Sequence, residues 1–302
     1  MTAAVQCVAC DDERASGATF CEACGRRLVT CTHCGGWVGD DGYCESCGMM
    51  AERESDHAED DAGASGAAVT DRGKRHHRNE VAAFFASYDG GVDLVVCDGV
   101  SASARADEAS SLAARTCGEA LTSTEPADAV AAAGAAVSAL GTDRDSPACT
   151  IVAASVRGSS IRVAWVGDSR AYWVPAGGPA AQLTEDDSWA RHAVALGADP
   201  ETAMLSPQAH AITAWLGADA PAVRPSVKEL DVEEPGTLVL CSDGLWNYLL
   251  DPADFADAVR GNLDKGPLAA AQALVAFANE RGGADNITVA LTPVGGPRGV
   301  LR

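Results

Sequence analysis

Four Cys-x-x-Cys pairs lie within the first 47 residues, and they constrain the folding of this chain more than any other feature. Two such pairs supply four thiolates, which match the tetrahedral coordination of Zn²⁺. Gaps of ten and nine residues separate the paired knuckles and suit short hairpins. The pairs therefore predict two zinc sites. The expected ligands are Cys7, Cys10, Cys21 and Cys24 at the first site and Cys31, Cys34, Cys44 and Cys47 at the second.

Residues 1–50 hold few large apolar side chains, so zinc binding would supply most of their folding free energy. This predicts a double zinc ribbon with two structural Zn²⁺, because four sulfurs leave no open position for catalysis. Gly25, Gly35 and Gly48 each follow the second cysteine of a pair, where a tight turn favours positive φ. Disulfides are the alternative, and they would require an oxidising compartment.

Charge argues against nucleic-acid or membrane binding. The chain has a formal net charge of −21, and residues 1–50 carry three Arg against seven Asp and Glu, a net charge of −4. Phosphate binding depends on clustered Lys and Arg, so we expect the cysteine-rich head to dock a protein partner. No apolar stretch long enough for a membrane span occurs and the N-terminus does not resemble a signal peptide, so we expect a cytoplasmic protein, and a monomer.

The composition changes after the head. Residues 51–67 lack aromatic and large aliphatic side chains, which predicts a flexible acidic linker. Residues 68–294 have the length of one domain, and the Gly- and Pro-rich residues 295–302 predict a loose tail.

Apolar periodicity predicts the elements of this domain. Strands are expected at 93–101, 149–156, 161–166, 171–174, 236–241 and 287–291, and helices at 107–122, 126–140, 252–262 and 267–281. The segment 184–225 is less regular and predicts a surface flap with short helices.

Four aspartates adjoin these strands: Asp98, Asp168, Asp243 and Asp285. A single Asp-Gly pair most often makes only a turn, but recurrence at four strand ends favours one carboxylate cluster. Clustered carboxylates repel one another unless cations lie between them, and an all-oxygen set suits Mn²⁺ or Mg²⁺. Two such ions activate water and stabilise displacement at phosphorus, so the residues point to metal-assisted phosphate hydrolysis.

A basic cluster opens the domain on an otherwise acidic chain. It contains Arg72, Lys74, Arg75, His76, His77 and Arg78 and is followed by Glu80. Such a cluster suits a bound phosphate, and the alternative is a solvated loop with ion pairs.

The order of motifs is selective. Asp71-Arg72-Gly73, Asn79-Glu80, VVCDGVS, WVGDSRAY, LCSDGLWNYL and GGADNITV follow one another between residues 69 and 293. This order resembles the metal-dependent serine/threonine protein phosphatases of the protein phosphatase 2C type, the PPM family. The resemblance implies an α+β fold in which two antiparallel β-sheets pack face to face between helices, an α-β-β-α sandwich.

The resemblance also implies roles for single residues. Asp98 would bridge two Mn²⁺ or Mg²⁺ ions, with the Gly99 carbonyl as a further ligand, and Asp243 and Asp285 would hold one of the ions. Glu80 would act through bound water, Asp168 would match a third, weaker metal site, and Asn286 would support Asp285. A water held between the two metals would attack a phosphoserine or phosphothreonine placed on the protein substrate by a Ser/Thr kinase.

The chain departs from the family pattern at three positions. Val81 stands where a second acid is usual, and Val100 where many relatives carry a His proposed as general acid. His76 falls at the position of the phosphate-binding Arg, with Arg75 and Arg78 close by and able to substitute. These departures motivate an alternative function, a catalytically weak or inactive phosphoprotein-binding or scaffold protein of the same fold.

Overall fold

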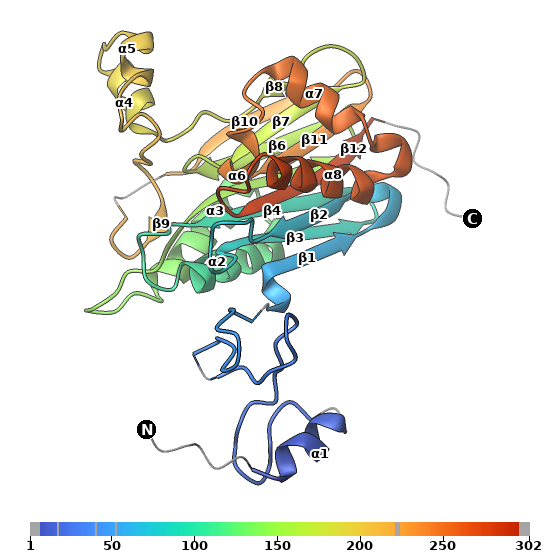
Figure 1. The fold of residues 1–302 in the computed structure, drawn as a ribbon. Coiled ribbons are helices and arrows are strands. Elements are labelled where there is room, and N and C mark those ends of the chain that lie inside the picture. The colour runs from blue at the N-terminus through green and yellow to red at the C-terminus, as the bar shows by residue number, and fades with distance from the viewer. Residues whose placement is uncertain (1–6, 17, 40, 52, 221–223, 296–302) are drawn as a thin grey trace. The chain divides into compact units, whose positions relative to one another are not determined.

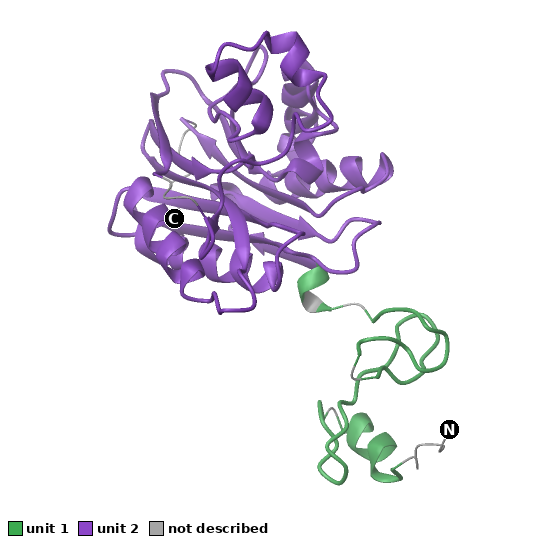
Figure 2. Cartoon of the chain, turned by 90° about the vertical axis from the view of Figure 1, so that its left-hand side faces the viewer, with its two compact units in different colours: residues 1–56 green, residues 57–302 purple. Residues whose placement is uncertain are grey.

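The computed structural model describes residues 7–16, 18–39, 41–51, 53–220 and 224–295. The chain divides into two compact units, residues 1–56 and residues 57–302 (Figure 2). The predicted tail, residues 295–302, lies almost wholly outside the described residues. No helix among the described residues combines the length and apolar character needed to cross a membrane.

The first unit contains the four cysteine knuckles. The gap between Cys10 and Cys21 holds a helix, α1 (Ala9–Ala15), rather than the expected hairpin. Asp11 and Asp12 in its first turn and Arg14 in its last complement the helix dipole, which favours a helix there. The gap between Cys34 and Cys44 is a hairpin, as predicted, with bridges such as Val38 to Cys44.

The second unit contains two antiparallel sheets (Figure 1). The first has the order β1 (His57–Asp61), β2 (Ala67–Asp71), β12 (Ile287–Val294), β11 (Gly236–Cys241), β7 (Arg170–Pro175), β8 (Ala181–Gln182). The second has the order β10 (Ser226–Asp231), β6 (Ser160–Val166), β5 (Ala148–Arg157), β4 (Gly91–Gly99), β3 (Val81–Tyr88), and β9 (Leu216–Gly217) pairs with β5.

Helices cover the outer faces of both sheets. Those on the first sheet are α6 (Asp243–Trp246), α7 (Pro252–Arg260) and α8 (Pro267–Glu280), and those on the second are α2 (Ala106–Leu121) and α3 (Pro126–Ser138). The flap, defined here as residues 184–220, carries α4 (Trp189–Ala195) and α5 (Pro200–Met204), which project from the sheets in Figure 1. Short 3₁₀ turns occupy Glu54–Asp56, Gly63–Ser65 and Leu263–Lys265.

Alternation along the strands builds three layers of core. In β11, Leu238 and Leu240 pack between the sheets, whereas Val239 and Cys241 face α7 and α8. In β4, Leu94 and Val96 share the layer between the sheets. The predicted sandwich of two antiparallel sheets flanked by helices is confirmed.

The prediction of a flexible linker at residues 51–67 is wrong for its second half. Residues His57–Asp61 form β1, which pairs in register with β2. All five β1 side chains are exposed, so the composition gave no sign of a strand. An edge strand is held by backbone hydrogen bonds and needs no buried side chain; here Glu59 also accepts hydrogen bonds from Gln272 of α8.

Besides β1, β2 and the two-residue strands β8 and β9, two strands have no counterpart among the predicted elements. Strand β3 is an edge strand whose residues are mostly half-buried, and β10 has an exposed, charged sequence. Both lie at the edges of the second sheet, where pairing on one side only relaxes the apolar pattern.

Gly73 offers a test of how the loop after β2 is packed. Its φ is +72°, and a Cβ there would lie 2.2 Å from the carbonyl oxygen of Asp285. We expect Gly73→Ala to cost about 1 kcal/mol of unfolding free energy from the left-handed backbone and a further ~1–3 kcal/mol from the clash. Gly178→Ala is the matched control, since Gly178 has a φ of +87° with nothing within 4 Å. Equal urea midpoints for the two variants would contradict the close packing.

Candidate functional site

Asp98 lies at the end of β4, where the alternation of the strand places its side chain. Leu94 and Val96, four and two residues earlier, face the layer between the sheets, so Asp98 faces the same layer at its open end. Gly99 follows, and its N–H donates to the Glu80 carbonyl at 3.0 Å. A Cβ at Gly99 would lie 2.7 Å from that carbonyl oxygen, so the close approach of β3 and β4 requires glycine.

The other three aspartates come from ends of both sheets. Asp243 is the first residue of α6, directly after β11, and Asp285 lies two residues before β12. Asp168 lies between β6 of the second sheet and β7 of the first, where the chain crosses from one sheet to the other. Each carboxylate is thus held at the margin of the layer that contains Asp98.

The pKa values show that these carboxylates lie close enough to interact. Burial, followed by the charges of Asp243, Asp168 and Asp285, raises the pKa of Asp98 well above its usual range. Burial and then Asp285 raise the pKa of Asp243 to about 6. Burial and then the charge of Asp243 raise the pKa of Asp168 to about 7. The cluster therefore holds negative charge only at a high cost unless a cation compensates it.

Asn286 connects the segments that carry these acids. Its Nδ2 donates to the carbonyls of Arg72 at 2.7 Å and Arg78 at 2.9 Å, and its Oδ1 accepts from the Glu80 N–H at 2.8 Å. Its own N–H donates to Asp285 Oδ1 at 2.8 Å. One side chain thus joins both ends of the basic segment to the loop before β12.

The basic segment lies beside the carboxylates. His76 Nε2 lies 3.1 Å from Asp285 Oδ1. Arg75 approaches Gly282 in the same loop, and the side chains of Arg75 and Arg78 are exposed. The structure therefore brings all three residues that the sequence predicts for phosphate binding to this edge, and it places His76 in contact with a predicted metal ligand.

Two supporting side chains were not predicted from the sequence. Ser242 Oγ donates to the Asn286 carbonyl and accepts from the Thr288 N–H, both at 3.1 Å, which fixes α6 against β12. Asp187 Oδ2 accepts from the Gly167 N–H at 2.9 Å and so holds the turn that carries Asp168. The Asp186-Asp187 pair was visible in the sequence, but only the fold shows which backbone amide it meets.

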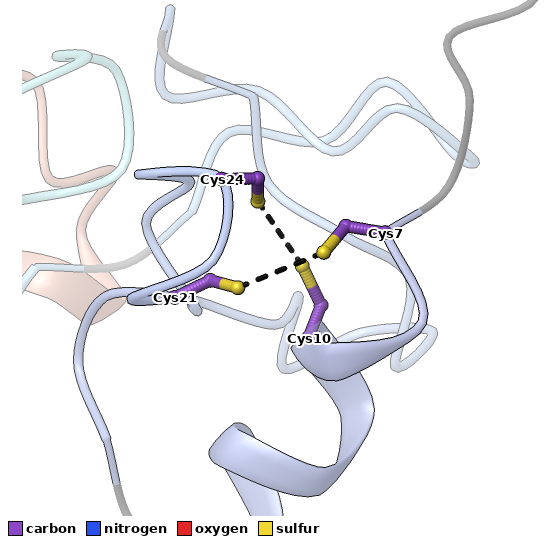
Figure 3. A group of neighbouring side chains, drawn as sticks. All are labelled: Cys7, Cys10, Cys21 and Cys24. Atoms are coloured by element: carbon purple, nitrogen blue, oxygen red, sulfur yellow. Dashed lines mark hydrogen bonds between the residues drawn. The ribbon is translucent and has the colours of Figure 1, made fainter.

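The eight cysteines form two groups in the first unit. Sulfur distances in the first group are 3.9 Å for Cys7 to Cys21 and 3.6 Å for Cys10 to Cys24, and Figure 3 shows the four sulfurs turned toward one another. In the second group they are 3.7 Å for Cys31 to Cys47 and 3.4 Å for Cys34 to Cys44. Tetrahedral ligands at a Zn–S length of about 2.3 Å lie about 3.8 Å apart, whereas a disulfide needs about 2 Å.

The turns and hydrogen bonds of the head also fit zinc. Gly25, Gly35 and Gly48 have φ values of 75°, 72° and 72°, as predicted. The N–H groups of Cys47 and Ser46 donate to Cys44 Sγ, an arrangement that stabilises a thiolate of the kind that zinc binds.

The carboxylates are spread more widely than the thiolates. Within the described part of the chain, three or more candidate ligand atoms lie within 4.8 Å of one another only in the two cysteine groups.

Comparison with known proteins agrees with this geometry. Residues 72–277 match the family model for protein phosphatase 2C. The serine/threonine phosphatase stp of Listeria welshimeri is 30% identical over 240 residues, which cover 74% of this chain and 92% of that protein.

Solved structures agree as well. The serine/threonine phosphatase of S. agalactiae has a TM-score of 0.65 and 30% identity, covering 75% of this chain and 98% of its own. The PPM Ser-Thr phosphatase MsPP of Mycobacterium smegmatis, solved in complex with cacodylate, has a TM-score of 0.64 and 30% identity. The match covers 78% of this chain and 100% of that chain. The chain therefore belongs to the protein phosphatase 2C family and is a serine/threonine protein phosphatase, with cysteine groups before the phosphatase domain that fit zinc ribbons.

Proposed function

We propose that this protein removes phosphate from phosphoserine and phosphothreonine at a site with two Mn²⁺ or Mg²⁺ ions between its sheets. The observation that carries the proposal is the raised pKa of Asp98, caused by burial and by three facing carboxylates. Such an arrangement is unfavourable as it stands and becomes favourable when divalent cations lie among the acids.

The side chains fit such ions. The donor set is all oxygen, with Asp98, Asp243 and Asp285 as principal ligands, the Gly99 carbonyl beside them, Glu80 acting through water and Asp168 at a third, weaker site. Bound there, the ions would supply a water activated at neutral pH and would compensate the charge of the phosphate.

The remaining residues position these groups and the substrate. Asn286 holds Asp285 and the backbone of Glu80 in place, so the ligand geometry is largely built before a metal binds. Arg75 and Arg78 extend exposed guanidinium groups, which suits them to donate to phosphate oxygens. His76 contacts Asp285, which favours the two arginines as the main phosphate contacts.

Val100 and Val81 determine which acidic groups are missing from the proposed site. Val100 has no proton to give, so the leaving group would be protonated by water or by His77, which is exposed in the basic segment. Val81 packs in the core between the sheets and supplies no carboxylate. Low activity, in which the protein binds phosphoproteins more than it hydrolyses them, is the alternative function.

For the head we propose two structural Zn²⁺ and the docking of a protein partner. Phe20, Tyr43 and Met49 are exposed apolar side chains in a unit of net negative charge, a surface suited to protein and unsuited to nucleic acid. A phosphoprotein substrate or the kinase that modifies it would be such a partner.

Removal of single carboxylates tests the metal site. We expect Asp98→Ala and Asp243→Asn to lower kcat/KM for p-nitrophenyl phosphate and for a phosphothreonine peptide by about 100-fold or more at millimolar Mn²⁺. Asp264→Asn, which changes an exposed acid on a 3₁₀ turn, should leave both unchanged. Wild-type turnover no higher than that of the Asp98 variant would contradict hydrolysis and favour the binding function.

The requirement for Mn²⁺ should depend on pH. Without metal the pKa of Asp243 is about 6 and that of Asp168 about 7, so protons compete with the cation below these values. The half-activating Mn²⁺ concentration should rise by up to about tenfold per competing proton as the pH falls by one unit below each pKa. In Asp168→Asn, the rise in the half-activating Mn²⁺ concentration that begins near pH 7 should be lost. A half-activating concentration constant from pH 5.5 to 8 would argue against carboxylate ligands.

Zinc content tests the head. Atomic emission analysis of the purified full-length protein should find about two zinc ions per chain, because each group of four thiolates binds one. Cys21→Ser and Cys31→Ser should each lower the content by about one ion, whereas Cys117→Ser, in the buried face of α2, should not change it. Disulfides in place of zinc would overturn this part of the proposal.

A further inference from the structure

A cavity of about 500 Å³ lies beside the segment that follows Asp98. Its lining includes Val100, Ala104, Ala148, Ile212, Trp215 and Arg144. The first three come from the β4–α2 loop and the start of β5, the next two from the flap, and Arg144 from the loop before β5. We call this cavity the Val100 pocket.

The floor of the Val100 pocket is fixed by hydrogen bonds. The Val100 N–H donates to the Ala148 carbonyl at 2.9 Å, and the Ser103 N–H donates to the Val100 carbonyl at 2.7 Å. Ser103 Oγ accepts from the Ala148 N–H at 3.2 Å. The loop after Asp98 is therefore tied to β5 on the side of the pocket.

An ion pair holds one wall. Arg105, the one non-glycine residue with positive φ in the described part of the chain, donates through Nε to Asp145 at 3.1 Å and through a terminal nitrogen to the Leu140 carbonyl at 2.7 Å. These bonds fix the loop that contains Arg144 and Asp145. A backbone held in this uncommon conformation indicates that the wall has one definite position.

The opposite wall comes from the flap. Trp215 Nε1 donates to Asp219 Oδ1 at 3.1 Å, and the next residue, Leu216, pairs with Cys149 of β5. The indole is thus attached to the same strand as the floor. Of the two carboxylates in the lining, Asp145 is paired with Arg105, and Asp219 accepts from the Trp215 indole. The apolar part of the lining comes from Val100, Ala104, Ile212 and Trp215.

The position of the pocket suits a residue of the substrate. Val100 follows Asp98 by two residues, so their Cα atoms lie within about 7 Å, and neighbouring Cα atoms of a peptide lie about 3.8 Å apart. A side chain next to the phosphorylated residue can therefore reach the pocket while the phosphate lies at the carboxylates. The volume falls in the range of about 300–1,000 Å³ typical of binding pockets and accommodates an aromatic ring.

We propose that the Val100 pocket binds a large apolar side chain directly before or directly after the phosphorylated Ser or Thr and so selects substrates. This inference rests on the phosphatase function proposed above. Val100, Ala104, Ile212 and Trp215 supply the apolar contacts, and Arg144 stays at the rim with its charge in solvent.

Phosphothreonine peptides that differ at one flanking residue test the pocket with the full-length protein and Mn²⁺. A peptide with Phe at the favoured flank should have a kcat/KM about tenfold higher than the same peptide with Gly, because an apolar pocket discriminates by tens of fold. p-Nitrophenyl phosphate, which has no flanking residue, serves as the reference substrate.

Two variants test whether the Val100 pocket causes the preference for Phe over Gly. Trp215→Ala, which removes a wall, and Ala104→Phe, which fills the cavity, should each lower the Phe-over-Gly preference to about twofold or less, while kcat/KM for p-nitrophenyl phosphate stays within about twofold. Ala198→Phe and Leu205→Ala, at exposed flap positions outside the lining, should keep the full preference. Should Trp215→Ala fail to fold, Ala104→Phe alone carries the comparison.

The outcomes separate the two proposals. No turnover of any substrate would contradict the phosphatase function itself. Turnover of p-nitrophenyl phosphate with equal kcat/KM for the Phe and Gly peptides at both flanks would overturn the pocket alone. A preference that persists in Ala104→Phe would place the selection elsewhere and would also overturn it.

Discussion

The repulsion among four carboxylates is the constraint on which the rest of the phosphatase unit depends. Two like charges about 4 Å apart near a protein surface repel by about 4 kcal/mol, and burial adds to that cost. Asp98 carries the largest part of this electrostatic cost, because the charges of Asp243, Asp168 and Asp285 all act on it. The fold maintains this arrangement because each acid lies at the end of a strand packed in a continuous core, which cannot move apart without losing that packing.

The contacts around the site show how the fold holds the carboxylates together despite their repulsion. Asn286 is buried and uses its amide fully, joining Arg72, Arg78 and Glu80 to the loop of Asp285. Gly73 and Gly244 let backbones approach where a Cβ would lie 2.2 and 2.0 Å from the carbonyls of Asp285 and Asn286. These two glycines, of which Gly244 belongs to the Asp243-Gly244 motif, are therefore required by packing as well as by the turns, and both keep carboxylates in place.

The two units are stabilised by different physics. The phosphatase unit buries three apolar layers, whereas the apolar clusters of the head consist of little more than cysteines with Leu28 and Val38. A core that small cannot offset the loss of chain entropy, so under the proposed function the two Zn²⁺ ions would supply the stability of the head. Partner docking at the head and selection at the Val100 pocket would then be separate contributions to substrate choice.

Much of the fold followed from the sequence because it depends on local pattern. The bounds expected for β11 match those observed, and α2, α3, α7 and α8 begin within one residue of the predicted positions. Apolar periodicity marks all four helices, and Pro at the first turn also marks α3, α7 and α8. The edge strands β1 and β10 escaped prediction because backbone pairing, rather than side-chain burial, makes them strands. The cysteine spacing and the order of the aspartate motifs are enough by themselves to predict the two kinds of metal site, because ligand chemistry is a property of residue type. Only the tertiary structure decided that Asn286 would join both ends of the basic segment to the loop before β12, that His76 would contact Asp285 and that flap and loop would enclose a pocket at Val100. Those contacts join residues up to 214 positions apart in the chain.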